Sequence, residues 1–270
     1  MLGNSYLLTE KIPTWYGTPA KKKSEELPFY WSATRHNMLK SCPSCFYRKY
    51  IKKEQEDPFK DKKHIYGYGE LVHYVIELAI KGEDLPEEAE IAARAGLEYI
   101  DQIETHVRLL KEKLDTLGLR DGSPEKEFLT WIRHPENPNE FLDIPLYGII
   151  DLSKILSNDG LKGQKMRIAD FKSGTTKWTK SKCMNSYQFK GYCYFGWAVT
   201  GEIPMIDVIS LIKKNGNKDA TVSNQPVEFT MKDLVGFYED TKRGMSICKD
   251  MMEGKYNLPS CSNNFFCPYR

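Results

Sequence analysis

The chain has 270 residues, of which 40% are hydrophobic and 28% charged, and its formal net charge at pH 7 is +2. This composition is that of an ordinary globular protein, and it excludes collagen-like and intrinsically disordered chains. No apolar run approaches the ~20 residues that a membrane helix needs, and the first residues lack the basic start and apolar middle of a secretory signal. We therefore expect a cytoplasmic protein, in a bacterial or phage-infected host cell, with no membrane partner.

The charges are unevenly distributed along the chain. Between Glu83 and Glu104 there are eight acidic residues and one arginine, in a helix-like pattern. Between Gly160 and Lys190 there are eight lysines and arginines and a single acid, Asp170. A phosphate-rich ligand would prefer the second region, although a solvated basic face would have the same composition.

The N-terminal part begins irregularly. Residues 1–30 contain three prolines and a lysine triplet, and we expect them to form a flexible N-terminal arm. Ser32 is a suitable N-cap for a short helix. A second short helix is expected to carry Phe46 and Tyr50.

Residues 31–120 are predicted to be mainly helical. The apolar residues between Gly69 and Gly82 recur at the i, i+3, i+4 and i+7 positions of a helix with one buried face. An acidic helix, or two helices with a break near Gly96, should follow over residues 86–117.

Strand patterns dominate residues 121–230. We predict three strands joined by turn-rich segments as antiparallel hairpins, then a buried aromatic helix, then two further strands. In chain order these elements cover residues 126–134, 140–156, 165–173, 184–199, 204–214 and 227–230. An amphipathic helix over 231–254 and a cysteine-containing tail complete residues 231–270. The pattern predicts a single α/β (α+β) domain from residue 31 to residue 270.

Asp170 and Lys172 stand at the end of an apolar strand. Residues two apart in a strand point to one face, so these two side chains should lie together with Phe171 turned toward the core. Asp151 ends an apolar run in the preceding predicted strand and should face Asp170 across the hairpin. Two converging carboxylates suit Mg²⁺ or Mn²⁺, and Lys172 could act on a water or on a phosphate beside the metal. A surface salt bridge is the plainer interpretation of Asp170 and Lys172.

Two helices contribute further polar residues. His73 lies at the edge of the apolar stripe on the helix over 69–82, where a packed or solvated histidine would be ordinary. Gln188 and Tyr192 are four residues apart and share one helix face just after the basic region. His73 precedes Asp151 in the chain, and Gln188 and Tyr192 follow Asp170. This order around the two carboxylates favours a functional interpretation of the three residues.

The order of these residues resembles a known family, the RecB-type nucleases of the PD-(D/E)XK superfamily, which includes AddB-like, CRISPR-associated RecB-like and phage exonucleases. The entry segment SATRHNMLKSCPSCFYRKY is similar to the opening of the family, and the resemblance runs from Ser32 to Cys267. The motifs that carry it are Gly69-x-x-x-His73, Gly148-Ile149-Ile150-Asp151, Asp170-Phe171-Lys172-Ser173-Gly174 and Gln188-x-x-x-Tyr192.

The resemblance implies a restriction-endonuclease-like core, which is a central mixed β-sheet flanked by helices, with an N-terminal helical insertion. It implies that the side chains of His73, Asp151 and Asp170 and the main-chain carbonyl of Phe171 bind the divalent metal, and that Lys172 is the catalytic lysine. Gln188 and Tyr192 would support the active site or the bound strand. Glu127 matches a glutamate on the first core strand of the family, with Glu125 competing for that position.

The implied activity is hydrolysis of DNA phosphodiester bonds, with an exonuclease favoured, in recombination, repair or phage replication. A loop after the catalytic strand is placed to meet phosphates and to stack on a base. Its residues are Thr175, Thr176, Lys177, Trp178 and Lys180. The implied partners are single- or double-stranded DNA and a recombinase or single-strand-annealing protein.

The seven cysteines favour reduced thiols or metal ligation over a disulfide framework. Several relatives carry a four-iron four-sulfur cluster, held by one cysteine in the Cys-Pro segment and three near the C-terminus. Cys42 fits the first position, and Cys261 and Cys267 fit two of the others, but Leu258 stands where the remaining one is expected. With Cys45 they would form a set of four that equally suits zinc. Packing as small apolar residues is the remaining alternative.

Two other functions compete with a nuclease. A catalytically inactive PD-(D/E)XK domain could bind nucleic acid or a partner, although it would have no reason to keep Asp151, Asp170 and Lys172. A zinc- or cluster-bearing interaction module would keep the cysteines and use the carboxylates only in ion pairs.

Overall fold

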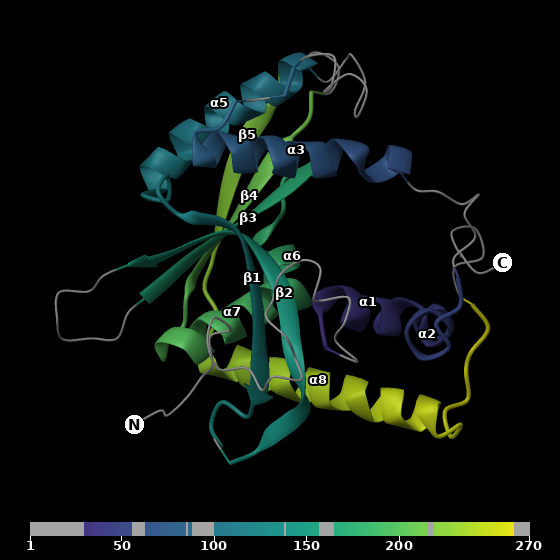
Figure 1. Cartoon of the computed structure of the whole chain (residues 1–270). Helices are drawn as coiled ribbons and strands as arrows, with labels where there is room; N and C mark the ends of the chain where they lie inside the picture. The colour runs from purple at the N-terminus through teal and green to yellow at the C-terminus, as the bar shows by residue number, and fades with distance from the viewer. Residues whose placement is uncertain are drawn as a thin grey trace. The chain divides into compact units, whose positions relative to one another are not determined.

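The computed structural model describes residues 30–55, 63–84, 86–87, 100–137, 139–156, 165–214 and 219–261 (Figure 1). They form two compact units. The first unit contains the described residues before 62, Phe128–Gly148 and the chain from Thr230 onward; the second contains Lys62–Glu127 and Ile149–Phe229. The predicted N-terminal arm, 1–30, lies outside the described residues except for Tyr30. The single domain over 31–270 stays a prediction.

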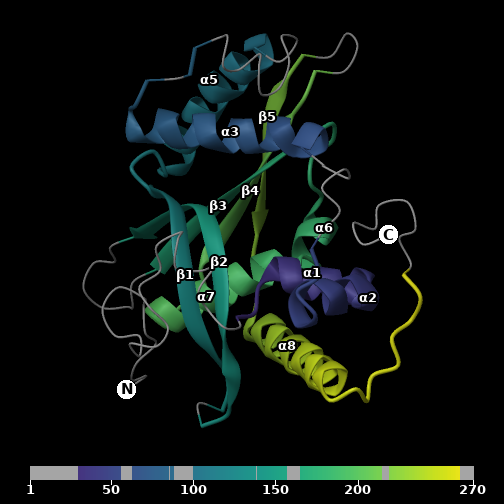
Figure 2. The same cartoon turned by 45° about the vertical axis from the view of Figure 1, so that its right-hand side comes forward.

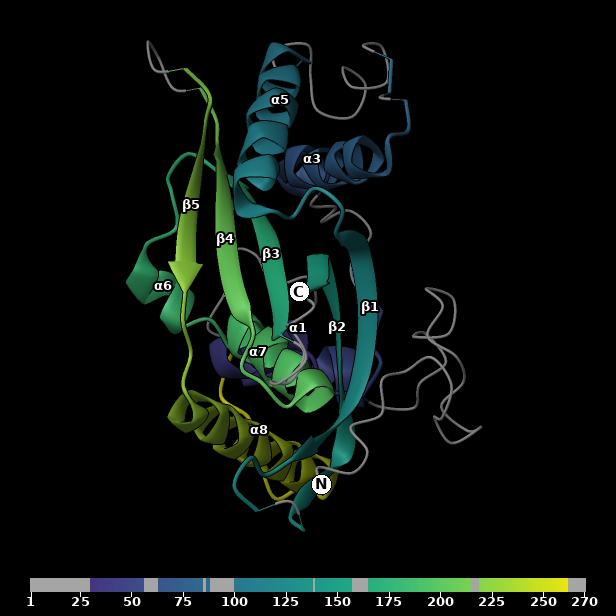
Figure 3. The same ribbon diagram turned by 90° about the vertical axis from the view of Figure 1, so that its left-hand side faces the viewer.

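Five strands form one mixed sheet in the order β1-β2-β3-β4-β5 (Figure 3). Strand β3 runs antiparallel to β2 and parallel to β4, and β4 runs antiparallel to β5. The parallel pair requires a crossover connection, which helices α6 and α7 supply between β3 and β4. The expected mixed sheet with flanking helices is therefore confirmed. The strands are β1 (Ser123–Arg133), β2 (Phe141–Leu156), β3 (Lys165–Gly174), β4 (Met205–Ile212) and β5 (Thr221–Val227).

The first four strands lie where the hydrophobic pattern predicts them, but the last one does not. The predicted strand over 227–230 is wrong, because β5 covers Thr221–Val227 and only Val227 is shared. The sequence of β5, TVSNQPV, is mostly polar and half-exposed and gives almost no strand periodicity. Thr230 instead starts the next helix, since the Asp233 carboxylate accepts hydrogen bonds from its N–H and its hydroxyl at 2.8 and 2.7 Å.

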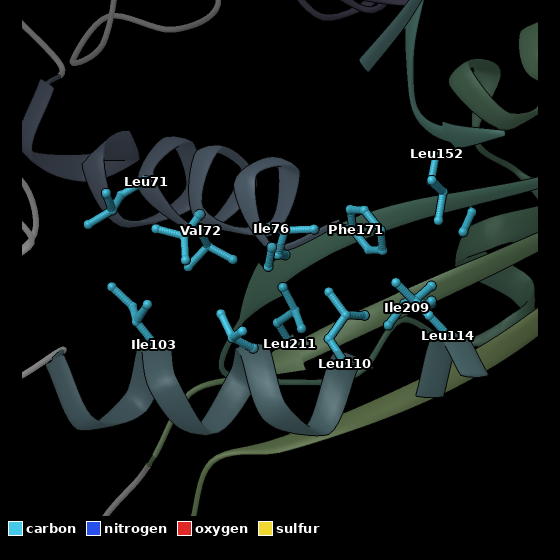
Figure 4. Packing of buried hydrophobic residues seen from close by; sticks show 14 of the residues in the cluster. Leu71, Val72, Ile76, Ile103, Leu110, Leu114, Leu152, Phe171, Ile209 and Leu211 are labelled. Carbon is cyan, nitrogen blue, oxygen red and sulfur yellow. The ribbon is translucent and has the colours of Figure 1, made fainter. Parts of the chain in front are cut away.

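Helices α3 (Lys63–Lys81) and α5 (Ile100–Leu117) belong to the second unit and lie side by side (Figures 1 and 2). Their apolar stripes meet side chains of β2, β3 and β4 in one hydrophobic cluster (Figure 4). The helix expected over 69–82 thus begins earlier than predicted. The part of the predicted acidic helix over 88–99 lies outside the described residues. The cluster includes Val72, Ile76, Ile103, Leu110, Leu114, Leu152, Phe171, Ile209 and Leu211.

The predicted aromatic helix over 184–199 corresponds to α7 (Tyr187–Thr200), which begins three residues later than predicted, and a short helix that was not predicted, α6 (Lys180–Met184), precedes it. The break has a local cause, because the extended backbone of Ser186 ends α6 and its hydroxyl caps α7 by accepting the N–H of Phe189. Gly201, with φ 77°, ends α7 in the left-handed conformation that glycine adopts without strain.

The first unit holds α1 (Ala33–Ser41), α2 (Pro43–Phe46), the π-helical turn η1 (Tyr47–Ile51) and α8 (Met231–Met252). Ser32 caps α1 as expected, with its hydroxyl accepting the N–H of Arg35. The second helix expected around Phe46 and Tyr50 is one α-helical turn followed by a π-helical one. In the described part of the chain, no helix has both the length and the apolar character that crossing a membrane requires.

Candidate active site

Strand β3 presents Asp170 and Lys172 together. The Lys172 ammonium lies 2.8 Å from Oδ2 and 3.1 Å from Oδ1 of Asp170, so the two groups form a direct ion pair. Phe171 between them points the other way and is buried in the hydrophobic cluster of the second unit (Figure 4). The alternation expected of a strand therefore places the acid and the base on one face.

Asp151 on β2 lies at the end of the paired part of the hairpin. Strand β2 pairs antiparallel with β3 as far as Leu152 and Ala169, which are the direct neighbours of Asp151 and Asp170 in the sequence. The Oδ2 atom of Asp151 accepts a hydrogen bond from the backbone N–H of Phe171 at 2.6 Å, which fixes its carboxylate against β3.

His73 reaches the carboxylates from α3. Its Nδ1 lies 3.6 Å from Oδ1 of Asp151. The helix approaches the strand closely, because a Cβ atom on Gly69 would lie only 3.1 Å from Oγ of Ser173. Gly69 thus allows α3 to approach the sheet closely, and this approach brings His73 near Asp151.

Glu125, rather than Glu127, is the glutamate of β1 that lies near these residues. Among the described residues, the ligand atoms of His73, Glu125 and Asp151 all lie within 4.8 Å of one another. Glu125 has a φ of 46°, an uncommon value for a residue other than glycine and a form of strain that often marks functional positions. In the described part of the chain both carboxylate oxygens of Glu127 are buried and accept no hydrogen bond.

Helix α7 completes the constellation with Gln188 and Tyr192. The Oε1 atom of Gln188 accepts a hydrogen bond from Lys172 at 3.1 Å, and its Nε2 atom donates to Oδ1 of Asp170 at 3.4 Å. The same Nε2 donates to the Tyr192 hydroxyl at 2.6 Å, and that hydroxyl donates to the carbonyl oxygen of Ile149 at 2.6 Å. The helix is thereby connected to both carboxylate-bearing strands.

Burial and charge shift the titration of these groups. Burial raises the pKa of Asp170 to about 7, against the lowering effect of the Lys172 ammonium. Burial disfavours the charged form of Lys172, but the carboxylates of Asp170 and Asp151 outweigh it and raise the pKa of the amine. His73 behaves similarly: burial opposes protonation, while the contact with Asp151 raises its pKa overall. Each cation is therefore stabilised by a neighbouring carboxylate.

The donor atoms fit a divalent metal. Carboxylate oxygens and one imidazole nitrogen are ligands that Mn²⁺ accepts, and the carboxylates alone suit Mg²⁺. The side chain of His73 is 29% exposed and that of Lys172 is 20% exposed, whereas Asp170 is fully buried. The site can therefore be reached from solvent at His73 and Lys172. Asp170 is not in the group that His73, Glu125 and Asp151 form among the described residues, and its carboxylate instead contacts Lys172 and Gln188.

The loop after β3 is mostly exposed. Thr175, Thr176, Lys177 and Lys180 are exposed, and Trp178 is half-buried. The backbone N–H of Trp178 donates a hydrogen bond to Oγ of Ser210 at 2.9 Å, which anchors the loop to β4.

Sequence reasoning missed Lys182. Its ammonium lies 3.9 Å from the centre of the Trp178 ring, a cation–π contact. The short separation of four residues between Trp178 and Lys182 in the sequence could have indicated this contact.

The cysteines are divided between the two units. Cys42, Cys45 and Cys261 come together in the first unit. Cys267 lies outside the described residues. Cys183, Cys193 and Cys248 are buried elsewhere.

Comparison with known proteins identifies a family and a protein of similar fold. The family model of the PD-(D/E)XK nuclease superfamily matches residues 30–270. The crystal structure of a protein described as "Putative exonuclease" from Eubacterium rectale is similar in fold, with a TM-score of 0.56 at 12% identity over 96% of this chain and 93% of that one. A structure described as SSO0001 has a TM-score of 0.29 at 14% identity, covering 68% of this chain and 77% of that one. No curated protein sequence matches the chain.

The family match covers all of the described residues, and the similar crystal structure shows the same fold. The ion pair of Asp170 and Lys172, Asp151 and the Gln188–Tyr192 pair lie within the matched range. The chain belongs to the PD-(D/E)XK nuclease superfamily.

Proposed function

We propose that this chain is a divalent-metal-dependent deoxyribonuclease that degrades DNA from an end, in recombination, repair or phage replication. The observation that carries the proposal is the ion pair of Asp170 and Lys172 on one strand, with the Asp151 carboxylate hydrogen-bonded to the N–H of Phe171 between them and His73 3.6 Å from Asp151. The preference for an exonuclease is supported only by the description of the similar crystal structure.

The residues proposed to hold the metal are His73, Asp151, Asp170 and the carbonyl group of Phe171, and the geometry adds Glu125. When bound there, Mg²⁺ or Mn²⁺ would polarise the phosphodiester and lower the pKa of a bound water. The N–H of Phe171 holds the Asp151 carboxylate in a fixed orientation, so this ligand needs no rearrangement of the strand.

Lys172 is proposed to act on the scissile phosphate. Its ammonium is held by Asp170 and Gln188 and remains partly exposed, so one of its three N–H donors is available to a phosphoryl oxygen. A fixed positive charge beside the oxygens where negative charge accumulates lowers the barrier to hydrolysis. Gln188 and Tyr192 are proposed as positioning residues, because they hold Lys172 and the end of β2.

The exposed loop after β3 is proposed to bind the DNA backbone. Lys177 and Lys180 are exposed and carry no acidic neighbour in the sequence between Asp170 and Glu202. Lysine contacts to phosphates account for most sequence-independent affinity. Trp178 offers an aromatic face, although Lys182 covers one side of its ring.

A catalytically inactive DNA- or partner-binding protein is the alternative. Asp170 is fully buried, and burial opposes the charged form of Lys172 as well. Burying such charges costs free energy, which apolar residues of similar size would avoid. A protein that only bound DNA would gain nothing from this arrangement.

Incubation with end-labelled linear DNA and with covalently closed circular DNA, in Mg²⁺, Mn²⁺ or EDTA, tests the proposal. We expect metal-dependent release of the end label from linear DNA, and closed circles that persist. Asp170→Ala and Lys172→Ala should both abolish release while retaining the circular dichroism spectrum of the wild type.

The outcomes separate the alternatives. Cutting of closed circles would replace the exonuclease by an endonuclease. DNA binding without cleavage in any metal would favour the inactive binding protein. Undiminished cleavage by both variants would place the active site elsewhere or indicate a contaminant.

A further inference from the structure

Two lysines lie beside the ring of Trp178 in the second unit. The ammonium group of Lys182 lies 3.9 Å from the ring centre, and that of Lys172, the lysine paired with Asp170, lies 5.7 Å from the same centre. Lys172 also lies 5.6 Å from the ring centre of Phe189. One aromatic side chain is therefore next to both the active-site lysine and a second, exposed lysine.

The ring of Trp178 is held in place from two directions. The backbone N–H of Trp178 donates a hydrogen bond to Oγ of Ser210 on β4 at 2.9 Å, and the ring packs against Phe189 on α7 with the ring centres 5.6 Å apart. Both Ser210 and Phe189 are buried. Trp178 therefore provides a fixed support for a group that lies on its ring.

Lys182 is held both at its backbone and at its ammonium group. The backbone N–H donates a hydrogen bond to the hydroxyl of Thr179, which caps α6, and the ammonium group lies over the ring of Trp178. A cation–π contact orients an ammonium group without neutralising its charge. A lysine that is already ordered also loses less conformational entropy when it binds an anion than a mobile lysine does.

The positive charge of Lys182 is not balanced by an acidic side chain. Within the described part of the chain no carboxylate forms an ion pair with it. The sequence between Asp170 and Glu202 contains no acidic residue. Because the ring is on one side of the ammonium group, N–H donors remain on the other side, where they are suited to a phosphate oxygen.

We propose that Lys182, supported by Trp178, binds the phosphate next to the scissile phosphate in the same DNA strand, an inference that rests on the nuclease function proposed above. Exposure increases outward from the site: Asp170 is fully buried, the side chain of Lys172 is 20% exposed, and Lys182 is exposed. A strand whose scissile phosphate lies at Lys172 therefore passes Lys182 as it leaves the site. Since both ammonium groups lie beside one ring, they are spaced for neighbouring phosphates rather than for distant ones.

A purely structural contact is the alternative interpretation of Lys182. The side chain could cover the apolar face of Trp178 and contribute only to the packing of the loop. Its replacement would then change the stability of the protein but not the number of phosphate contacts. Phosphate contacts are distinguished by the salt dependence of DNA binding, because each one releases counterions from the DNA.

This salt dependence tests the proposal without cleavage. Binding of a short fluorescent oligothymidylate is measured by anisotropy in EDTA, at several salt concentrations, for the full-length wild type, Lys182→Gln, Lys172→Gln and the double variant. Each lost phosphate contact should reduce the slope of log K against log salt by about 0.7 for a single strand, so we expect a fall of about 0.7 in each single variant and about 1.4 in the double variant. Lys165→Gln, which removes a lysine at the start of β3, should retain the wild-type slope.

Variants of the ring test the support that Trp178 provides. Trp178→Leu should lower the slope as Lys182→Gln does, and the combination of the two should lower it no further, because the lysine has already lost its position. Trp178→Phe keeps an aromatic face and should retain most of the wild-type slope. All variants should retain the circular dichroism spectrum of the wild type.

Cleavage of single-stranded DNA provides an independent readout. A contact made equally in the bound substrate and in the transition state affects KM and leaves kcat unchanged. Lys182→Gln should therefore raise KM several-fold at nearly constant kcat, whereas Lys172→Gln should lower kcat.

Three binding results would overturn the proposal. A wild-type slope in Lys182→Gln would leave only the structural contact. A double variant with the slope of Lys172→Gln alone would mean that the two lysines share one phosphate, and a lower slope in Lys165→Gln would mean that loss of any lysine has this effect. If the slopes change as expected but no metal supports cleavage, the two phosphate sites stand and the proposed nuclease activity fails; cleavage with unchanged slopes is the reverse case.

Discussion

Lys172 and Asp170 form an ion pair on β3, with Nζ 2.8 Å from Oδ2, and Gln188 contacts both residues from α7. The aspartate is fully buried, whereas the lysine side chain is 20% exposed. The pair therefore has one member inside the protein and one that can reach a substrate. This asymmetry separates the metal-binding role proposed for Asp170 from the phosphate-binding role proposed for Lys172.

Lys172→Gln should remove cleavage but not metal binding. Loss of one fixed donor to a developing oxyanion typically lowers kcat about a hundred- to a thousand-fold. The Mn²⁺ affinity should remain measurable, because the carboxylates and His73 are untouched. Cleavage of end-labelled DNA at saturating Mg²⁺ and titration calorimetry with Mn²⁺ measure the two quantities.

Lys165→Gln is the matched control, since Lys165 begins the same strand and is distant from Asp170. It should retain both cleavage and Mn²⁺ binding. A Lys172→Gln protein that cleaves normally would remove Lys172 from the catalytic machinery.

Glu125→Gln should weaken Mn²⁺ binding, whereas Glu127→Gln should not. The carboxylate of Glu125 lies within 4.8 Å of ligand atoms of His73 and Asp151, and Glu127 is not in that group. Loss of a charged ligand should raise the Kd for Mn²⁺ by at least about tenfold. Calorimetry on the two variants, which carry the same chemical change two residues apart, provides the comparison. The reverse ranking would identify Glu127 as the additional acid.

Replacing Lys177 and Lys180 with alanine should weaken DNA binding and make it less sensitive to salt. Each phosphate contact contributes about 0.9 to the slope of log K against log salt for duplex DNA and about 0.7 for single strands, so the slope should fall by roughly 1.4 to 1.8. Binding is measured by fluorescence anisotropy in the Asp170→Ala background, which prevents cleavage. Alanine at Lys111 and Lys113 on α5 removes the same charge and should leave the slope unchanged.

Gly148→Ala should destabilise the protein. A Cβ atom at Gly148 would lie 2.6 Å from two ring carbons of Phe128, and the buried ring of Phe128 has little room to move. Overpacking of this kind costs about 1–3 kcal/mol of the free energy of unfolding. Urea denaturation followed by circular dichroism measures it.

Gly236→Ala on α8 is the matched control for Gly148→Ala. No atom lies within 4 Å of the position that a Cβ atom would take at Gly236, so the substitution should stabilise the helix by about 1 kcal/mol. Equal stability of both variants would contradict the close approach of β2 to Phe128.

The pattern of the sequence determined the elements whose signal is local. Period-two alternation placed Asp170 and Lys172 on one face of a strand, and the helical repeat of apolar residues predicted the buried faces of α3 and α5. Both depend on backbone geometry that neighbouring residues establish. The mostly polar edge strand β5 has no such repeat, and the sequence therefore predicted it in the wrong place.

Only the tertiary structure decided which distant residues meet. Glu125 and Glu127 have the same chemistry and similar positions in the sequence, yet of these two described residues it is Glu125 that groups with His73 and Asp151. Spacing along the chain likewise allowed several groupings of cysteines, and Cys42, Cys45 and Cys261 converge through the packing of segments more than 200 residues apart. Periodicity describes one segment at a time, whereas such contacts depend on how segments pack against one another in three dimensions.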